Sequence, residues 1–172
     1  MQRTLKNALK IALVIAPILM SASHASANPQ PMKDSYIGAG VAAGVTNGGQ
    51  EGDAANTGGS IQGRYAIPNA PVSVRGAVVF SNETSAIMPM VSYDLAVTNN
   101  ANVYAGVGYA FHERDGSPTP IGNKDSVVLT TGVEAKVTRD IVLFSDAKLG
   151  INAYEDSPAS AVSVQVGGGY RF

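Results

Sequence analysis

The sequence predicts an all-β fold, an eight-stranded antiparallel β-barrel that spans a membrane. The first observation is that eight segments alternate between apolar and small or polar residues with a period of two, which is the period of a β-strand. The second is that the connections between these segments differ in length in a regular order. The third is that only 15% of the residues are charged, against about 25% in soluble domains.

The chain begins with the pattern of a secretory signal peptide. Three basic residues within the first ten precede an apolar run at residues 11–20, and Ala25-Ser26-Ala27 supplies the small residues of a cleavage site. The apolar run is about half the length of a membrane-spanning helix, which needs roughly 20 residues. We therefore expect a cleaved signal peptide at residues 1–27, a short periplasmic arm at 28–34 and the barrel at 35–172.

The alternating segments have about the 9–11 residues that a tilted strand needs to cross a membrane. In the first segment, Ile37, Val41 and Val45 share one face, and glycines such as Gly38 and Gly40 share the other. The later segments repeat this division between an apolar face and a small or polar face. We expect strands at residues 35–45, 60–68, 72–81, 87–97, 101–112, 126–137, 141–151 and 161–172.

Pro89 lies inside the expected fourth strand. Proline cannot donate a backbone hydrogen bond, and a closed barrel has no edge strand where the loss of this donor is harmless. We therefore expect either a bulge at Pro89 or a strand that begins only after this residue.

The order of the connections predicts the orientation of the barrel. Short turns are expected near residues 69–70, 98–100 and 138–140, and longer connections at 46–59, 113–125 and 152–160, with a shorter one among them at 82–86. Outer-membrane barrels have short periplasmic turns and long external loops. This order places both termini in the periplasm and the longer connections outside the cell.

A soluble lipocalin-like barrel is the alternative, and its apolar face would point inward. The second face of the predicted strands is rich in glycine and alanine, which suits a cramped interior better than a hydrated exterior. The chain also has no Trp and no Cys to fill or staple a ligand pocket. Without Cys, disulfides and Cys-ligated zinc are excluded. The sequence therefore favours the membrane barrel.

The segment at residues 161–172 reads AVSVQVGGGYRF and ends in an aromatic residue of the apolar face. With this ending and the strand pattern, the sequence resembles the small eight-stranded outer-membrane β-barrel proteins: the opacity-like proteins, the OmpX type and the transmembrane domain of OmpA. The resemblance implies that Tyr170 and Phe172 form a recognition signal for the barrel-assembly machinery. It also implies an outer-membrane, cell-surface location with outer-membrane lipid around the wall.

Charged residues occur on the small and polar face, which would line the lumen. An unpaired charge in a narrow interior costs several kcal/mol, so these residues are expected to pair. A side-chain-filled plug, which the resemblance to OmpA-type barrels implies, is favoured over a selectivity filter, because eight strands leave an interior just wide enough for side chains. The expected network consists of Arg64, Arg75, Asp94, Glu134, Lys136, Asp146, Lys148 and Arg171.

The expected external loops carry eight carboxylates against two basic residues, a net charge of −6. Loops 46–59 and 113–125 are the candidates for contact with a surface ligand. Nucleic acid is not an expected partner, because phosphate binding needs clustered Lys and Arg. No EF-hand spacing is present, and no metal or other cofactor is expected.

The sequence favours a structural or surface-interaction protein with a filled lumen and acidic external loops. A small porin-like channel is the alternative. A barrel-borne enzyme is the third interpretation, and it rests on His112 beside Glu113, because outer-membrane deacylases and proteases on barrels use histidine with Ser or Asp. No Ser-His-acid spacing is recognisable, so no catalytic residue is assigned and no enzyme activity is expected.

Overall fold

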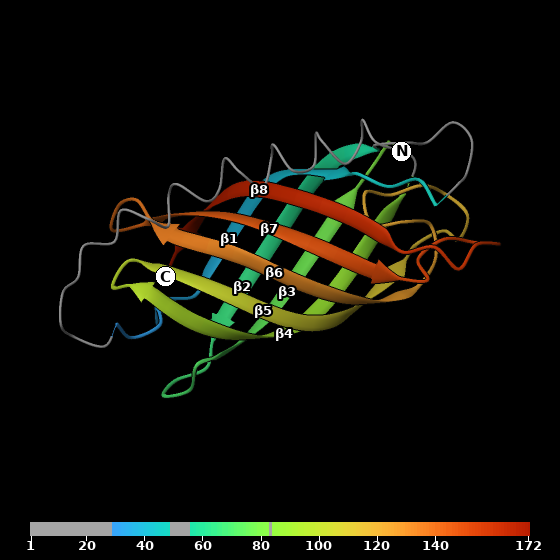
Figure 1. Cartoon of the computed structure of the whole chain (residues 1–172). Helices are drawn as coiled ribbons and strands as arrows, with labels where there is room; N and C mark the ends of the chain where they lie inside the picture. The colour runs from blue at the N-terminus through green and yellow to red at the C-terminus, as the bar shows by residue number, and fades with distance from the viewer. Residues whose placement is uncertain (1–28, 49–55, 83) are drawn as a thin grey trace, which may run out of the picture.

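The computed structural model describes residues 29–48, 56–82 and 84–172, so the expected signal peptide at residues 1–27 lies outside the described part of the chain. The described residues form eight strands that follow one another around one closed sheet (Figure 1). Among the described residues, no helix is both long and apolar enough to cross a membrane. The strands are β1 (Tyr36–Gly44), β2 (Thr57–Ala66), β3 (Val72–Phe80), β4 (Ser85–Thr98), β5 (Ala101–His112), β6 (Ser126–Lys136), β7 (Ile141–Ile151) and β8 (Ala161–Arg171).

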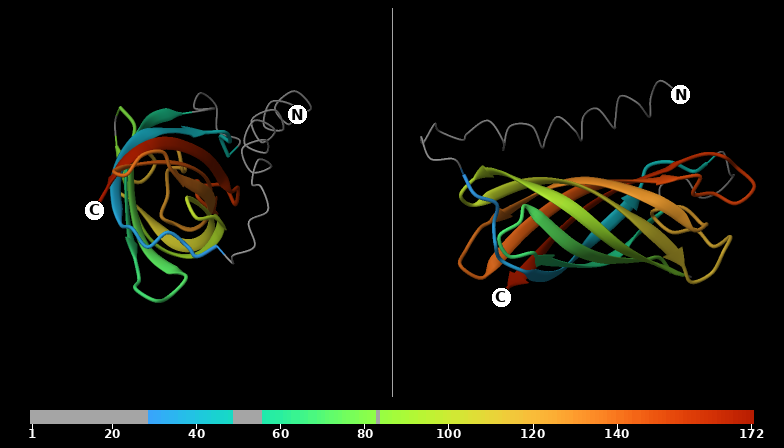
Figure 2. Two further views of the ribbon diagram at one scale, coloured as in Figure 1. Left: turned by 90° about the vertical axis from the view of Figure 1, so that its left-hand side faces the viewer. Right: turned by 90° about the horizontal axis from the view of Figure 1, so that it is seen from below.

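Every strand pairs with its two neighbours in antiparallel fashion, and the sheet closes where β1 meets β8. Ile37 of β1 lies opposite Gly63 of β2 on one side and opposite Tyr170 of β8 on the other. An end-on view shows the strands as a ring (Figure 2, left). The predicted eight-stranded antiparallel barrel is therefore confirmed. The strands expected at 101–112 and 141–151 match β5 and β7, the expected starts at 72, 126 and 161 match β3, β6 and β8, and the remaining boundaries differ by one to three residues.

The two ends of the barrel differ in their connections. One end carries the start of β1 and the end of β8, and we call it the termini end (Figure 2, right). Its connections are short and cover residues 67–71, 99–100 and 137–140. The opposite end, the loop end, carries the connections at 45–56, 81–84, 113–125 and 152–160, of which all but 81–84 are long.

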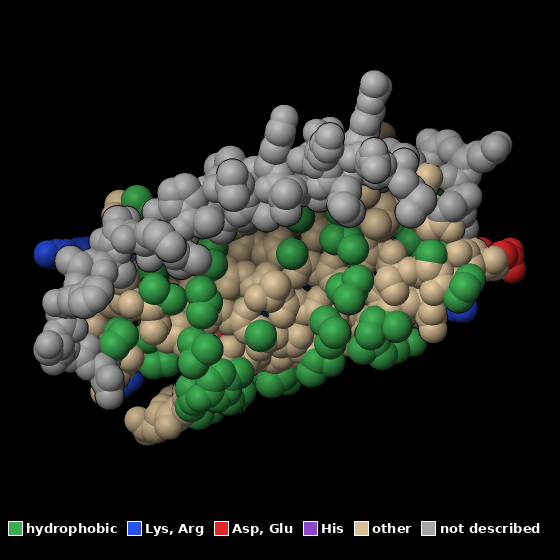
Figure 3. Space-filling view, in the orientation of Figure 1, with side chains coloured by type: hydrophobic (Ala, Val, Ile, Leu, Met, Phe, Trp, Pro, Cys, Tyr) green, Lys and Arg blue, Asp and Glu red, His purple; other side chains and the backbone are tan. Residues whose placement is uncertain are grey.

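The outer wall is apolar and the interior holds the charged residues of the strands. Ile37, Val41 and Leu95 are exposed on the wall by 57%, 62% and 54%, whereas Arg75 and Lys148 are buried inside. Figure 3 shows hydrophobic side chains along the wall and charged side chains at the two ends. A barrel with its apolar face outward is built for lipid and not for water. The lipocalin-like alternative, with the apolar face inward, is therefore wrong.

β4 runs through Pro89 without a bulge. Pro89 pairs with Gly76 of β3 in an unbroken register. On the β5 side, no pairing occurs at Met88 and Pro89, yet the pairs before and after them keep the same register. The register shift in β4 lies instead between Ala96 and Thr98. The expected bulge or late start at Pro89 is therefore wrong, because the missing donor interrupts pairing locally and the flanking pairs keep the strands aligned.

Candidate functional site in the lumen

Four charged side chains meet inside the barrel and form what we call the four-charge cluster, made of Arg64, Arg75, Asp94 and Glu134. Arg64 lies 2.7 Å from Asp94 and 3.1 Å from Glu134, measured between nitrogen and oxygen. Arg75 lies 3.1 Å from each of the same two carboxylates. Each arginine therefore contacts both acids, and the cluster is electrically neutral. All four side chains are at most 1% exposed.

Polar neighbours use the remaining hydrogen-bonding groups of the cluster. The Nε atoms of Arg64 and Arg75 donate to the hydroxyls of Ser73 and Ser92, at 2.9 and 2.8 Å. Both hydroxyls donate in turn to Asp94. Buried charges are tolerated when they are paired and fully hydrogen-bonded. This arrangement therefore suits a packed interior better than an ion path.

Aromatic and amide groups complete the shell around the cluster. The guanidinium carbon of Arg75 lies 3.6 Å from the centroid of the Tyr104 ring, a cation–π contact. The hydroxyl of Tyr36 accepts a hydrogen bond from Arg75 at 3.2 Å, and the amide of Asn102 donates to Glu134 at 3.1 Å. These contacts fix the side chains in one arrangement.

The other four residues of the expected network lie in two separate groups. Lys148 pairs with Asp146 and donates to Gln165 at 2.9 Å. Lys136 and Arg171 instead reach the carboxylate of Asp34, each at 2.7 Å. The sequence placed Asp34 in the arm, outside the strand pattern, so its role as the shared partner was missed. The structure thus divides the eight expected residues into three groups along the lumen.

Between the four-charge cluster and the loop end, a large part of the interior is apolar, beside buried polar residues such as Ser60 and Thr130. Met88 and Met90 precede Ser92 and Asp94 on β4 and point to the same inner side. The side chains around them are at most 3% exposed and form one contiguous group, which we call the apolar section. It consists of Ala42, Ala77, Val79, Ala86, Met88, Met90, Ala110, Ile121 and Val128. The inward phase of β4 could have revealed Met88 and Met90, but Ile121 comes from a loop and gave no periodic signal.

The loops at the loop end are hydrogen-bonded to one another. The carbonyl of Pro118 accepts from the Asn56 amide at 2.7 Å and from the Ser81 hydroxyl at 2.9 Å. The hydroxyl of Tyr154 donates to the Thr46 carbonyl at 2.6 Å. Burial raises the pKa of Tyr154 above its usual value, so this phenol remains a donor. The described parts of these connections therefore form an ordered cap, and much of loop 46–59 lies outside the described residues.

His112 lies under this cap with Thr119 and Asp125 on either side of its ring. Its Nε2 is 3.3 Å from the Thr119 hydroxyl, and its Nδ1 is 3.6 Å from Asp125. The sequence of hydroxyl, imidazole and carboxylate resembles the nucleophile, base and acid of a catalytic triad. However, the Thr119 hydroxyl already donates to the carbonyl of Gly122 at 2.7 Å. The His112 ring is fully buried, and Thr119 is only 5% exposed. The geometry therefore serves the packing of the loop.

Tyr170 and Phe172 lie on the outer wall at the termini end, 58% and 75% exposed. The backbone N–H of Phe172 donates to the carbonyl of Ser35 at 3.0 Å. This position at the closing seam is compatible with the expected assembly signal, which stays a prediction.

Within the described residues, no group of three or more His, Cys, Asp or Glu side chains is placed to hold a metal ion.

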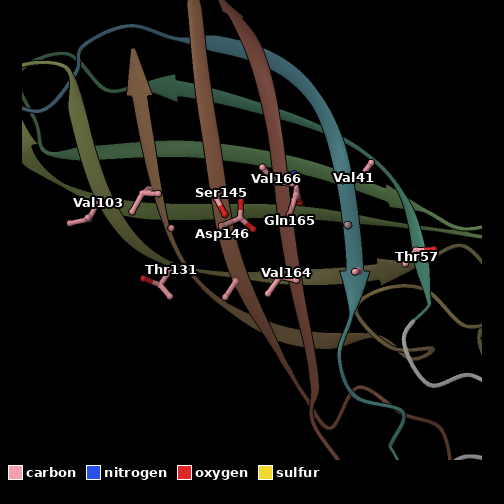
Figure 4. A pocket seen from close by; sticks show the side chains of 14 residues that line it. Val41, Thr57, Val103, Thr131, Ser145, Asp146, Val164, Gln165 and Val166 are labelled. Carbon is pink, nitrogen blue, oxygen red and sulfur yellow. The ribbon is translucent and has the colours of Figure 1, made fainter. Parts of the chain in front are cut away.

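A hollow of about 530 Å³ lies on the outer wall and is lined by residues of β5, β6, β7, β8, β1 and β2. Its outward side chains are small, and they include Thr131 and Ser145 (Figure 4). The Thr131 hydroxyl donates to the backbone carbonyl of Tyr104 at 3.1 Å. Because this hydroxyl is bonded within the sheet, it does not give the hollow a polar group to orient a ligand.

The closed sheet, the apolar wall and the filled interior define a class of protein, the small transmembrane β-barrel of the outer-membrane type. No protein-family model matches the sequence, and no curated protein matches it. Among solved structures, Ail of Yersinia pestis, the attachment invasion locus protein, matches with a TM-score of 0.54 and 18% identity over 81% of this chain and 99% of Ail.

Two further solved structures give the same picture. Neisserial surface protein A matches with a TM-score of 0.54 and 17% identity over 80% of this chain and 95% of that protein. A second structure of Ail, in complex with the heparin analogue sucrose octasulfate, matches with a TM-score of 0.50 and 20% identity over 82% of this chain and all of that one. At these identities, the similarity establishes the fold.

Proposed function

We propose that this protein is a non-conducting outer-membrane barrel that presents an acidic cap of loops at the cell surface for structural or binding roles. The observation that supports the proposal is the burial of the inward side chains along the lumen. The four-charge cluster fills one part of the interior and the apolar section fills the part nearer the loop end. An eight-stranded barrel of this kind leaves no continuous path for water.

In the proposed orientation, both termini lie in the periplasm and the loop end faces the outside. This orientation follows the rule that outer-membrane barrels have short periplasmic turns and longer external loops. At the loop end, Glu113, Asp115, Asp125, Glu155 and Asp156 outnumber Arg114 and Lys124, which gives a net charge of −3 for these described residues. The loop end would therefore present negative charge to the cell surroundings.

The charge of the cap bears on the chemistry of its partner. Sucrose octasulfate, found with Ail, is a polyanion, and an acidic surface repels polyanions. We therefore expect a cationic or neutral surface ligand on this chain, and not heparin-like molecules or nucleic acid. The charges of the cap are exposed, so this preference weakens as salt rises.

Conductance across a planar bilayer separates this proposal from the alternative, a small porin-like channel. The wild-type barrel should give current at the baseline of an empty bilayer. Glu134→Ala should also stay near baseline, because the apolar section still blocks the lumen. Steady ion-selective current in the wild type, with selectivity altered in Glu134→Ala, would establish the channel instead.

Catalysis is not part of the proposal. His112 has no exposed ring atoms, and the hydroxyl beside it is committed to the loop backbone. Purified wild type and His112→Ala should therefore show the same absence of turnover on lipid A and on peptides. Turnover that disappears in His112→Ala would restore the enzyme interpretation.

A further inference from the structure

The described residues before β1, 29–35, lie across the lumen at the termini end, and we call them the arm. Met32 of the arm is 4% exposed and packs with Tyr36, Val142 and Phe144 inside the barrel. Its backbone N–H donates to the side chain of Asn102 on β5 at 3.1 Å. One short segment therefore contacts both β5 and β7, which shows that it crosses the opening.

The arm also touches the four-charge cluster directly. The carbonyl of Met32 accepts a hydrogen bond from Arg64 at 2.9 Å, and the carbonyl of Asp34 accepts another at 3.2 Å. The arm therefore lies between this cluster and the solution at the termini end. Figure 2 (left) shows the segment, in blue, running across the ring of strands.

The side chain of Asp34 ties the arm to the rim of the barrel. One carboxylate oxygen lies 2.7 Å from Lys136 of β6, and the other lies 2.7 Å from Arg171 of β8. The Asp34 side chain is 32% exposed, in contrast to the buried cluster below it. Water therefore reaches these two ion pairs, and they can open without the desolvation of a buried charge.

We propose that the arm reversibly closes the lumen at the termini end, as a stopper, and that the two ion pairs of Asp34 hold it in place, as a latch. When the latch opens, the arm leaves the mouth and water reaches the four-charge cluster, while the sheet stays closed.

The contacts that remain after release make the movement reversible. Arg64 keeps Asp94, Glu134 and Ser73, so no buried charge is left unpaired. Arg171 keeps its hydrogen bond to the Arg139 carbonyl at 2.5 Å. The barrel is closed by the ladder of β1 and β8, which runs from Tyr36 to Gly44 on β1. Of the arm residues, Ser35 lies next to this ladder, and its carbonyl accepts from the Phe172 N–H; residues 29–34 can therefore move while the ladder stays intact. Local opening of this kind has a lower free energy than global unfolding.

Single cysteines can test the stopper, because the chain has no Cys of its own. Three reporters suffice in the folded full-length barrel: Met32→Cys on the arm, Ser73→Cys beside the four-charge cluster and Ser60→Cys at a buried position nearer the loop end. Each is combined with Asp34→Asn and, as a matched control, with Asp140→Asn in the neighbouring turn. The measured quantity is the rate of labelling by a small charged methanethiosulfonate reagent.

We expect Asp34→Asn to speed labelling of Met32→Cys and Ser73→Cys by about two- to thirtyfold, the effect of losing two partly exposed ion pairs. Ser60→Cys and all Asp140→Asn variants should keep the wild-type rate. An unchanged rate at Ser73→Cys would overturn the stopper, even if Met32→Cys reacts faster. Equal acceleration of all three reporters would also overturn it, because it would indicate opening of the whole barrel.

Discussion

Arg64 and Arg75 lie directly opposite each other in the pairing of β2 with β3, with both side chains inside the barrel. Like charges in directly opposed positions destabilise a sheet. Here Asp94 of β4 and Glu134 of β6 offset the repulsion, because each carboxylate contacts both arginines. The four side chains are therefore stable as a set, and removal of one member affects the other three.

The first prediction concerns the loss of one acid from this set. Glu134→Ala should lower the free energy of unfolding by about 3–5 kcal/mol, because it leaves a buried positive charge without its partner. Urea unfolding of the barrel, followed by the shift of its heat-modifiable band on gels, measures this loss. The exposed Glu113→Ala is the control and should change stability by no more than about 0.5 kcal/mol. A loss below about 1 kcal/mol in Glu134→Ala would indicate a hydrated cluster.

The second prediction concerns the apolar section. Met88 is fully buried, so Met88→Ala should destabilise the barrel by about 2–5 kcal/mol through the cavity that it creates. Met88→Leu keeps nearly the same volume and should cost less than about 1.5 kcal/mol. The same unfolding assay compares the two variants. Equal stability of both would show that the interior is loosely packed at this position.

The third prediction concerns the seam between β1 and β8, where glycines let the two backbones and their neighbours approach closely. A Cβ atom at Gly40 would overlap the carbonyl oxygen of Val166, whereas a Cβ at Gly76 would meet nothing within 4 Å. Gly40→Val should therefore reduce the yield of folded barrel, and Gly76→Val should leave it unchanged. The folded fraction after refolding into detergent micelles measures both. Equal yields would contradict the steric argument.

The fourth prediction concerns orientation. Trypsin added to intact cells should cut after Arg114 or Lys124, which are exposed in the connection at 113–125. It should spare the bond after Arg139, which lies in the turn at the termini end. Mass spectrometry of the protein extracted from cells identifies the cleaved bonds. Cleavage after Arg139 alone would reverse the proposed orientation.

The fifth prediction concerns pH. Burial raises the pKa of Asp34, but its bonds to Lys136 and Arg171 outweigh burial and hold that pKa below the ordinary value of 3.8. A carboxylate with a depressed pKa stabilises the folded contact above the ordinary value, and this contribution is lost as the pH falls through the depressed one. Hydrogen-exchange protection of the Met32 N–H should therefore be constant from neutral pH to about 4 and fall below it.

The control for this pH effect is Asp34→Asn. In this variant the Met32 N–H should show low protection throughout the pH range, because the neutral side chain at position 34 cannot form the two ion pairs at any pH. Exchange rates are compared as protection factors, which remove the intrinsic pH dependence of exchange. A wild-type protection factor that does not change below pH 4 would show that the ion pairs do not hold the arm.

Much of the fold follows from the alternation of residue types, because a period of two determines which face of a strand each side chain occupies. The same alternation placed Lys136 and Arg171 in the lumen but gave no register between strands, so it could not separate them from the four-charge cluster. Asp34 and Ile121 lie outside the strands, where no periodic signal exists. Their positions depend on how irregular backbone folds back into the two mouths of the barrel.

The closing pair of strands also has a consequence for the order of folding. Tyr36 of β1 lies opposite Arg171 of β8, so the first strand to be synthesised acquires its second partner only after nearly the whole barrel has been made. Contacts of such large sequence separation form slowly. Until β8 arrives, seven strands could form only an open sheet with two unpaired edges, which is prone to aggregate. Variants with a defective β8 should therefore be lost as aggregates or proteolysed chains, and not accumulate as partly closed barrels.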